Sequence, residues 1–202
     1  MQKDKRDMCA TVKLNQRILI LTEGKKTEQN YYNSIKRVYR LPSVEVFDSK
    51  KNTGKELLSQ ALEMQKKARR ENNEYDEIWI VIDRDGYTKH PEVFDKANKY
   101  PYIKIAFSSP CFEFWFLLHF ENTTAPFHNC DDVISRLKKH IPDYGKNIDY
   151  FSFLSNQLQN AIINAKRVNE HQFKTANCPI WQFNPYTENV KLVERLINFN
   201  RV

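Results

Sequence analysis

Acidic residues end two apolar segments of this 202-residue chain, and in each case one of the chain's four glycines follows them. The first segment ends at Glu23 and the second at Asp83 and Asp85. In an extended chain, residues two apart point to the same side, so Asp83 and Asp85 could share one ion. Carboxylate oxygens are the ligands that Mg²⁺ or Mn²⁺ prefers, and the three side chains would form such a site if they converge.

Alternating strand and helix patterns would bring these carboxylates together. Apolar runs and alternating residues predict four strands, at 16–22, 43–47, 77–82 and 102–107. Apolar residues at helical spacing predict the intervening helices, at 26–40, 54–70 and 91–99. This order predicts an α/β fold with a four-stranded, mainly parallel sheet flanked by helices. The carboxyl ends of parallel strands lie at one edge of the sheet, where such folds place their sites.

The second half of the chain reads as helical. Ser109 and Pro110 are good residues for starting a helix, and the apolar stretch 111–120 that follows them predicts a buried one. Later patterns predict helices at 131–140, 154–170 and 187–198. We therefore expect a flexible arm at 1–15, an α/β core at 16–125 and a helical extension at 126–202, packed together as one domain.

Charge and composition narrow the function classes. The net charge is +7, which favours a polyanionic partner such as nucleic acid, although solubility alone would also account for it. No apolar run reaches membrane-spanning length, and the charged start MQKDKRDMCA predicts no secretory signal. We therefore expect a cytoplasmic protein without a membrane partner.

The cysteines are widely spaced. Cys9, Cys111, Cys130 and Cys178 form no C-x-x-C pair, a pattern that argues against both a disulfide framework and a zinc site.

Several other residues carry weaker signals. Glu113 lies at the start of the buried apolar helix, where it is either a further metal ligand or a charge that complements the helix dipole. Lys25 and Lys26 follow Gly24 and form either an anion-binding turn or a solvated one. Arg84 points away from its acidic neighbours and could contact phosphate or pair with an acid.

A simpler explanation exists for the second acidic group. Asp-Arg-Asp-Gly is a common polar turn after a strand, because Asp side chains form hydrogen bonds with nearby backbone. Two acidic strand ends in neighbouring strand–helix units, each followed by Gly, favour a site over a turn.

Four further segments carry a resemblance to known proteins: ILTEGKKTEQNYY ending at Tyr32, IWIVIDRDG at 78–86, SSPCFEFWFLLHFE at 108–121 and NPYT at 184–187. They resemble the TOPRIM fold and, more narrowly, the RloB-like family of bacterial phage-defence proteins, which is related to the AbiL abortive-infection system. The TOPRIM fold is shared by topoisomerases, bacterial primases and overcoming-lysogenization-defect nucleases. The first two segments carry the acidic residues, while the last two make the narrower assignment.

The resemblance implies a reaction and partners. Glu23 matches the strand-end glutamate of TOPRIM enzymes, a general base or metal ligand, and Asp83 and Asp85 match the pair that holds the divalent ion. The implied function is a Mg²⁺- or Mn²⁺-dependent nuclease in abortive-infection defence, acting on DNA or RNA, including tRNA. The implied partner is an ABC-type ATPase (RloA-like), which agrees with the lack of a phosphate-loop motif in this chain. A homo-oligomer is compatible with the resemblance.

Two other functions are compatible with the same residues. The first is an adaptor or sensor module of a defence complex, which has kept the fold and lost catalysis. The second is a nucleotidyl transferase acting on a small nucleotide, because the same acidic pocket would serve that chemistry.

Overall fold

The computed structural model describes residues 16–24, 26–51, 53–84, 90–146 and 148–199 of the chain. The arm expected at 1–15 lies outside these residues.

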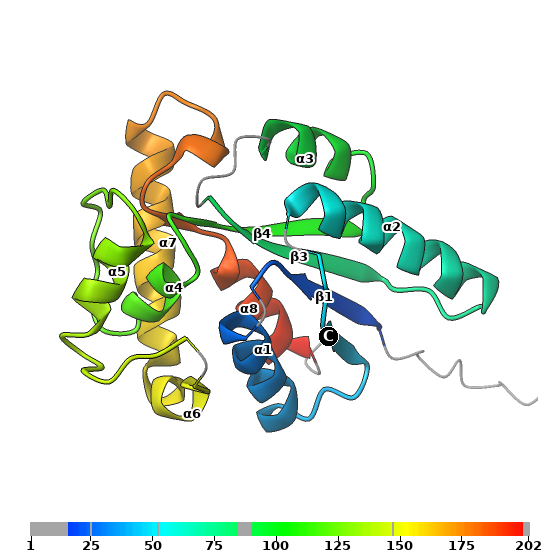
Figure 1. Ribbon diagram of the computed structural model, residues 1–202, viewed down its shortest axis with the longest axis horizontal. Helices are drawn as coiled ribbons and strands as arrows, with labels where there is room; N and C mark the ends of the chain where they lie inside the picture. Colours follow the sequence, from blue (N-terminus) through cyan, green and yellow to red (C-terminus); the bar gives the residue numbers. More distant parts are fainter. Residues whose placement is uncertain (1–15, 25, 52, 85–89, 147, 200–202) are drawn as a thin grey trace, which may run out of the picture.

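One five-stranded sheet forms the centre of the fold, in the order β2-β1-β3-β4-β5 (Figure 1). Its strands are β1 (Ile18–Thr22), β2 (Val44–Phe47), β3 (Glu77–Asp83), β4 (Ile103–Ser109) and β5 (Tyr186–Thr187). The first four strands are parallel to one another, and β5 runs antiparallel to β4. The predicted α/β class with a mainly parallel sheet is therefore confirmed.

Helices cover both faces of the sheet because its central strands are apolar on both sides. The residues of β1 alternate between two cores: Leu19 and Leu21 pack with α2 (Gly54–Arg70) and α3 (His90–Ala97). Ile18 and Ile20 pack with α1 (Thr27–Val38) and α8 (Asn189–Ile197) on the opposite face. Figure 1 shows these two helix pairs on either side of the strands.

The fifth strand differs from the prediction. The NPYT segment was expected to start a helix, but Tyr186 and Thr187 pair with Ser109 and Ser108 of β4 before α8 begins. A two-residue strand is too short to show an alternating pattern, and its partner is remote in sequence, so the local sequence gives no sign of it.

The remaining helices pack around the β5 edge of the sheet, against one another and against α1. They are α4 (Glu113–Leu117), α5 (Cys130–Leu137), α6 (Phe151–Leu154) and α7 (Leu158–Thr175), with short 3₁₀ turns at Ser155–Gln157 and Ile180–Gln182. The first helix is shorter than the predicted 111–120, because Ser109 is the last residue of β4 and does not cap α4. Among the described helices, none is both long and apolar enough to cross a membrane.

The cysteine prediction is wrong for one pair. Cys111, between β4 and α4, forms a disulfide with Cys130, the first residue of α5. A spacing of 19 residues gives no local motif, and the two side chains meet only because α4 packs against α5.

Candidate functional site

Glu23 and Asp83 lie side by side where β1 and β3 end. Thr22 pairs with Val81 in the parallel register, so the chain leaves both strands at the same edge. The backbone N–H of Glu23 donates to the carbonyl of Val81 at 3.0 Å. The backbone N–H of Asp83 then donates to Oε2 of Glu23 at 3.3 Å. The Glu23 carboxylate is therefore held against the end of β3.

Glu28 adds a carboxylate that the sequence analysis did not select. It lies in the first turn of α1 and is only 7% exposed. Its carboxylate lies directly against Gly24, so that a side chain on Gly24 would overlap it. The glycine thus leaves room for an acid rather than serving the turn alone. An acid in the first turn of a helix that directly follows a glycine turn is the signal that could have identified it.

Glu113 reaches the same region from α4. It is 3% exposed, and its Oε1 accepts a hydrogen bond from the Tyr144 hydroxyl at 3.1 Å. The Lys146 ammonium lies 3.6 Å from the same oxygen, but the Lys146 side chain is 60% exposed to solvent. Oε2 lies 3.3 Å from Sγ of Cys130.

These four acids, Glu23, Glu28, Asp83 and Glu113, form the carboxylate cluster, and their proximity alters the pKa of Asp83 and of Glu28. Burial raises the pKa of Asp83 well above its ordinary value, and the charges of Glu28, Glu113 and Glu23 add to the rise. Burial also raises the pKa of Glu28 to about 7, with Glu113 and Glu23 adding to the rise against the effects of its own backbone N–H and Lys146. The cluster is therefore short of positive charge.

Asp83 shows this shortage most directly. The residue as a whole is partly exposed, but its Oδ1 is buried and has no hydrogen-bond partner among the described residues. A buried carboxylate oxygen without a partner is costly, and a cation would satisfy it. The donor set of four carboxylates is hard and suits Mg²⁺ or Mn²⁺.

The spacing of the cluster fits a hydrated ion better than a dehydrated one. Among the described residues, only Cys111, Glu113 and Cys130 bring three potential ligand atoms within 4.8 Å of one another. Mg²⁺ usually keeps several of its waters and uses one or two direct carboxylates, so the cluster can hold it without closing to that distance. The residues present therefore fit the expected ion.

The other predicted site residues have different placements. Lys26 is exposed and precedes the first residue of α1. Arg84 donates from a guanidinium nitrogen to the Ser109 hydroxyl at 3.3 Å, at the same sheet edge. Lys25 and Asp85 lie outside the described residues.

A buried hydrogen-bond network joins β4, β5 and α8 close to the cluster. The Tyr32 hydroxyl donates to Asn189 Oδ1 at 2.6 Å, and Asn189 Nδ2 donates to the Ser108 hydroxyl at 2.8 Å. Burial raises the pKa of Tyr32 well above its ordinary value, and the charges of Tyr31, Glu28 and Asp83 add to the rise. The Tyr32 hydroxyl therefore stays protonated beside the acids. The network fixes β4, the strand that pairs with Asp83.

The comparisons with known proteins point to one family. A family model described as RloB-like protein matches residues 18–196, which include all the described acids of the cluster. Comparison with curated proteins and with solved structures finds no match.

Proposed function

The chain belongs to the RloB-like family, and we propose that it is a metal-dependent nuclease that hydrolyses phosphodiester bonds at the carboxylate cluster. One observation carries the proposal: four carboxylates, two from the ends of β1 and β3 and two from α1 and α4, lie together with too little positive charge, and a buried Asp83 oxygen has no partner among the described residues. A structural acid cluster would instead be neutralised by arginine or lysine. The TOPRIM-type architecture is part of the same proposal.

Asp83, Glu28 and Glu113 would hold the ion, because Glu28 and Glu113 are buried and their charges raise the pKa of Asp83 more than the charge of Glu23 does. A bound Mg²⁺ or Mn²⁺ would neutralise charge on the phosphoryl group and lower the pKa of a bound water. Glu23 is partly exposed and is oriented by the Asp83 backbone N–H, so it is placed to accept a proton from the attacking water. Asp85 remains a proposed ligand.

Positive charge near the cluster would orient the nucleic acid. Arg84 lies at the same sheet edge and Lys26 at the start of α1, so both are suited to contact phosphates. The net charge of +7 supports a polyanionic substrate, DNA or RNA, and tRNA is one such substrate. We include Lys25 in this proposed contact surface.

The biological setting of the proposal follows from the family resemblance. The nuclease would act in abortive-infection defence against phage, in the cytoplasm. Its activity would be regulated by an ABC-type ATPase partner.

The test compares cleavage by two isosteric variants. Wild-type protein is incubated with plasmid, single-stranded DNA and total RNA in Mg²⁺, Mn²⁺ or EDTA, alone and with the ATPase partner. Asp83→Asn should abolish cleavage that EDTA also abolishes, whereas Asp95→Asn, at an exposed position on α3, should leave it intact. Cleavage that persists in EDTA or in Asp83→Asn would contradict the proposal.

An adaptor or sensor module is the second candidate function. It is favoured by the spacing of the cluster, where no three of the described carboxylates approach within 4.8 Å. Absence of cleavage on every substrate, with the ATPase partner present, would support this candidate over the nuclease.

A further inference from the structure

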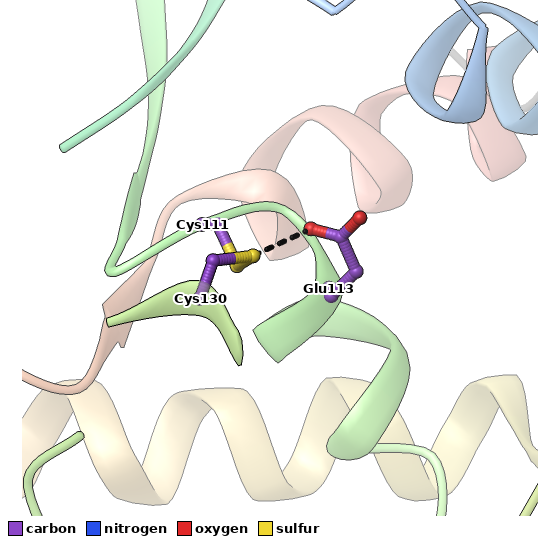
Figure 2. Close-up of side chains that lie close together, drawn as sticks. All are labelled: Cys111, Glu113 and Cys130. Atoms are coloured by element: carbon purple, nitrogen blue, oxygen red, sulfur yellow. Dashed lines mark hydrogen bonds between the residues drawn. A yellow bond between two sulfur atoms is a disulfide. The ribbon is translucent and has the colours of Figure 1, made fainter. Parts of the chain in front are cut away.

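A second group of metal-ligating side chains adjoins the carboxylate cluster and differs from it in chemistry. Figure 2 shows Cys111, Cys130 and Glu113 together, with the Glu113 carboxylate directed at the sulfur of Cys130. All three residues are buried, with exposures of 2%, 7% and 3%. Their ligand atoms all lie within 4.8 Å of one another. Sulfur ligands select zinc-like cations rather than Mg²⁺.

The disulfide keeps this group from binding a metal. Each sulfur in it has a covalent partner and no hydrogen, so the 3.3 Å contact with Glu113 becomes a hydrogen bond only when Cys130 is a thiol. A dithiol reductant transfers two electrons and two protons to the bond and is itself oxidised to a disulfide, leaving two thiols. These thiols then lie beside a buried carboxylate.

We propose that Cys111, Cys130 and Glu113, once the disulfide is reduced, form a binding site for a thiophilic divalent cation of the Zn²⁺ type. Binding releases the two thiol protons to solvent and leaves two thiolates and one carboxylate on the ion. Tetrahedral zinc with Zn–S bonds of about 2.3 Å separates two sulfurs by roughly 3.8 Å, so the two sulfurs move apart after reduction to hold the ion. The fourth position is left for water.

Glu113 belongs to both groups, so the two sites compete for it. Its Oε2 faces Cys130, while its charge raises the pKa of Asp83 and Glu28 in the carboxylate cluster. A zinc ion on Oε2 withdraws that charge from the cluster and adds its own positive charge nearby. On the proposed function, which this consequence assumes, bound zinc would oppose Mg²⁺ and inhibit cleavage.

Cobalt provides a direct test because sulfur-bound Co²⁺ absorbs in the near ultraviolet. The protein carries Cys9→Ser and Cys178→Ser, so that the only cysteines left are the pair. It is reduced with a phosphine, freed of metal and titrated with Co²⁺. The expected result is a sulfur–cobalt charge-transfer band that saturates at one equivalent and disappears when Zn²⁺ is added.

The controls separate this site from other binding. Protein reoxidised with diamide should show no band, a control that needs no further substitution. Cys130→Ser should remove the band, and Glu113→Gln should weaken Co²⁺ binding by about tenfold or more. A reduced protein whose two thiols react with a thiol reagent, yet which shows no band, would overturn the proposal, and so would a band that survives Cys130→Ser.

The nuclease assay distinguishes failure of this inference from failure of the proposed function. Zn²⁺ should inhibit Mg²⁺-dependent cleavage by the reduced protein and not by the oxidised protein. A cobalt band without any cleavage would leave the metal site standing and remove the nuclease. Cleavage without a cobalt band would remove the metal site and leave the proposed nuclease standing.

Discussion

The two ends of β3 carry acids in opposite electrostatic situations. Glu77, at the start of the strand, accepts from the Arg195 Nε and the Trp79 Nε1, both at 2.8 Å. Arg195 bonds to Oε1 and Trp79 to Oε2, and the Lys104 ammonium lies 3.2 Å from Oε2 as well. Although burial acts to raise it, hydrogen bonds from Arg195 and Trp79 bring the pKa of Glu77 below its ordinary value. Asp83, at the other end of the strand, faces acids, and its pKa is raised.

The difference separates a carboxylate that stabilises the fold from one that we propose as a metal ligand. Glu77 has its cations within the chain, so the protein gains from ionising it. Asp83 is ionised at a cost that the described residues do not offset, which is typical of functional sites. Four predictions would break or sharpen this comparison.

The largest expected effect is that Asp83→Asn and Glu77→Gln change cleavage and stability in opposite patterns. Asp83→Asn should lower metal-dependent cleavage at least about a hundredfold and raise the metal-free unfolding free energy by about 1 kcal/mol, because it removes a charge next to other acids. Glu77→Gln should leave cleavage within about twofold and lower the unfolding free energy by about 2 kcal/mol, because it weakens charged hydrogen bonds. Cleavage rates in Mg²⁺ measure the first quantity, and urea denaturation at pH 8 in EDTA measures the second. Parallel effects of the two variants would remove the distinction.

The second prediction concerns pH. The pKa of Glu28 is raised to about 7, so its folded state binds a proton more tightly than its unfolded state does. Its stabilising contribution is therefore fully present below about pH 4.5 and is lost as pH rises through 7, by up to about 3 kcal/mol. Urea denaturation in EDTA from pH 5 to 8 should show this fall in the wild type and a flatter profile in Glu28→Gln.

Glu77 provides the matched control for the pH experiment. Because the pKa of Glu77 is lowered in the folded protein, its contribution to stability is present above the ordinary pKa of glutamate. That contribution is lost only as the pH falls below this value. Glu77→Gln should therefore keep the wild-type slope between pH 5 and 8. Adding Mg²⁺ should reduce the wild-type slope, because the ion stabilises the ionised cluster, and an unchanged slope would speak against ion binding there.

The third prediction concerns the glycine beside Glu28. Gly24→Ala would place a methyl group where the Glu28 carboxylate lies, so the acid must move out of the cluster. We expect metal affinity, measured by calorimetry, to fall about tenfold. Gly54→Ala is the control, since its added carbon would meet Ile82 at an ordinary 3.4 Å. Equal affinities in the two variants would mean that Glu28 is not a ligand.

The smallest effect is expected at Lys146. Lys146→Met removes a positive charge beside Glu113, but the lysine is mostly exposed and solvent screens it. At pH 8.5, where Glu28 is ionised, Mg²⁺ affinity should rise by about two- to threefold. Lys139→Met, at an exposed position in the turn after α5, should leave the affinity unchanged. A fall in affinity in Lys146→Met would show that Lys146 supports the site by another means.

The sequence predicted the parts of the fold that repeat a pattern locally. The apolar runs of β1 and β3 are long and buried on both faces, so they were found together with the helices between them. The carboxyl-edge rule for parallel sheets then located Glu23 and Asp83. β5 was missed because Tyr186 and Thr187 become a strand only through pairing with β4.

Tertiary packing decided the remaining features of the site. In the sequence, Glu28 is one of several charged residues on amphipathic helices. Only its burial against Gly24 distinguishes it from Glu63 on α2, which is not buried. Cys111 and Cys130 carry no spacing motif, and their contact depends on how α4 meets α5. Such contacts between distant segments have no periodic signature in the sequence.

The Asn189 network has a consequence for the order in which the protein is made. Asn189 bonds to Tyr32 across 157 residues and to Ser108 across 81, so the strand beside Asp83 gains these supports only after residue 189 has been made. A chain still emerging from the ribosome carries every acid of the cluster before it carries β5 and α8. On the proposed function, a nascent chain that lacks these elements would therefore not yet cut nucleic acid.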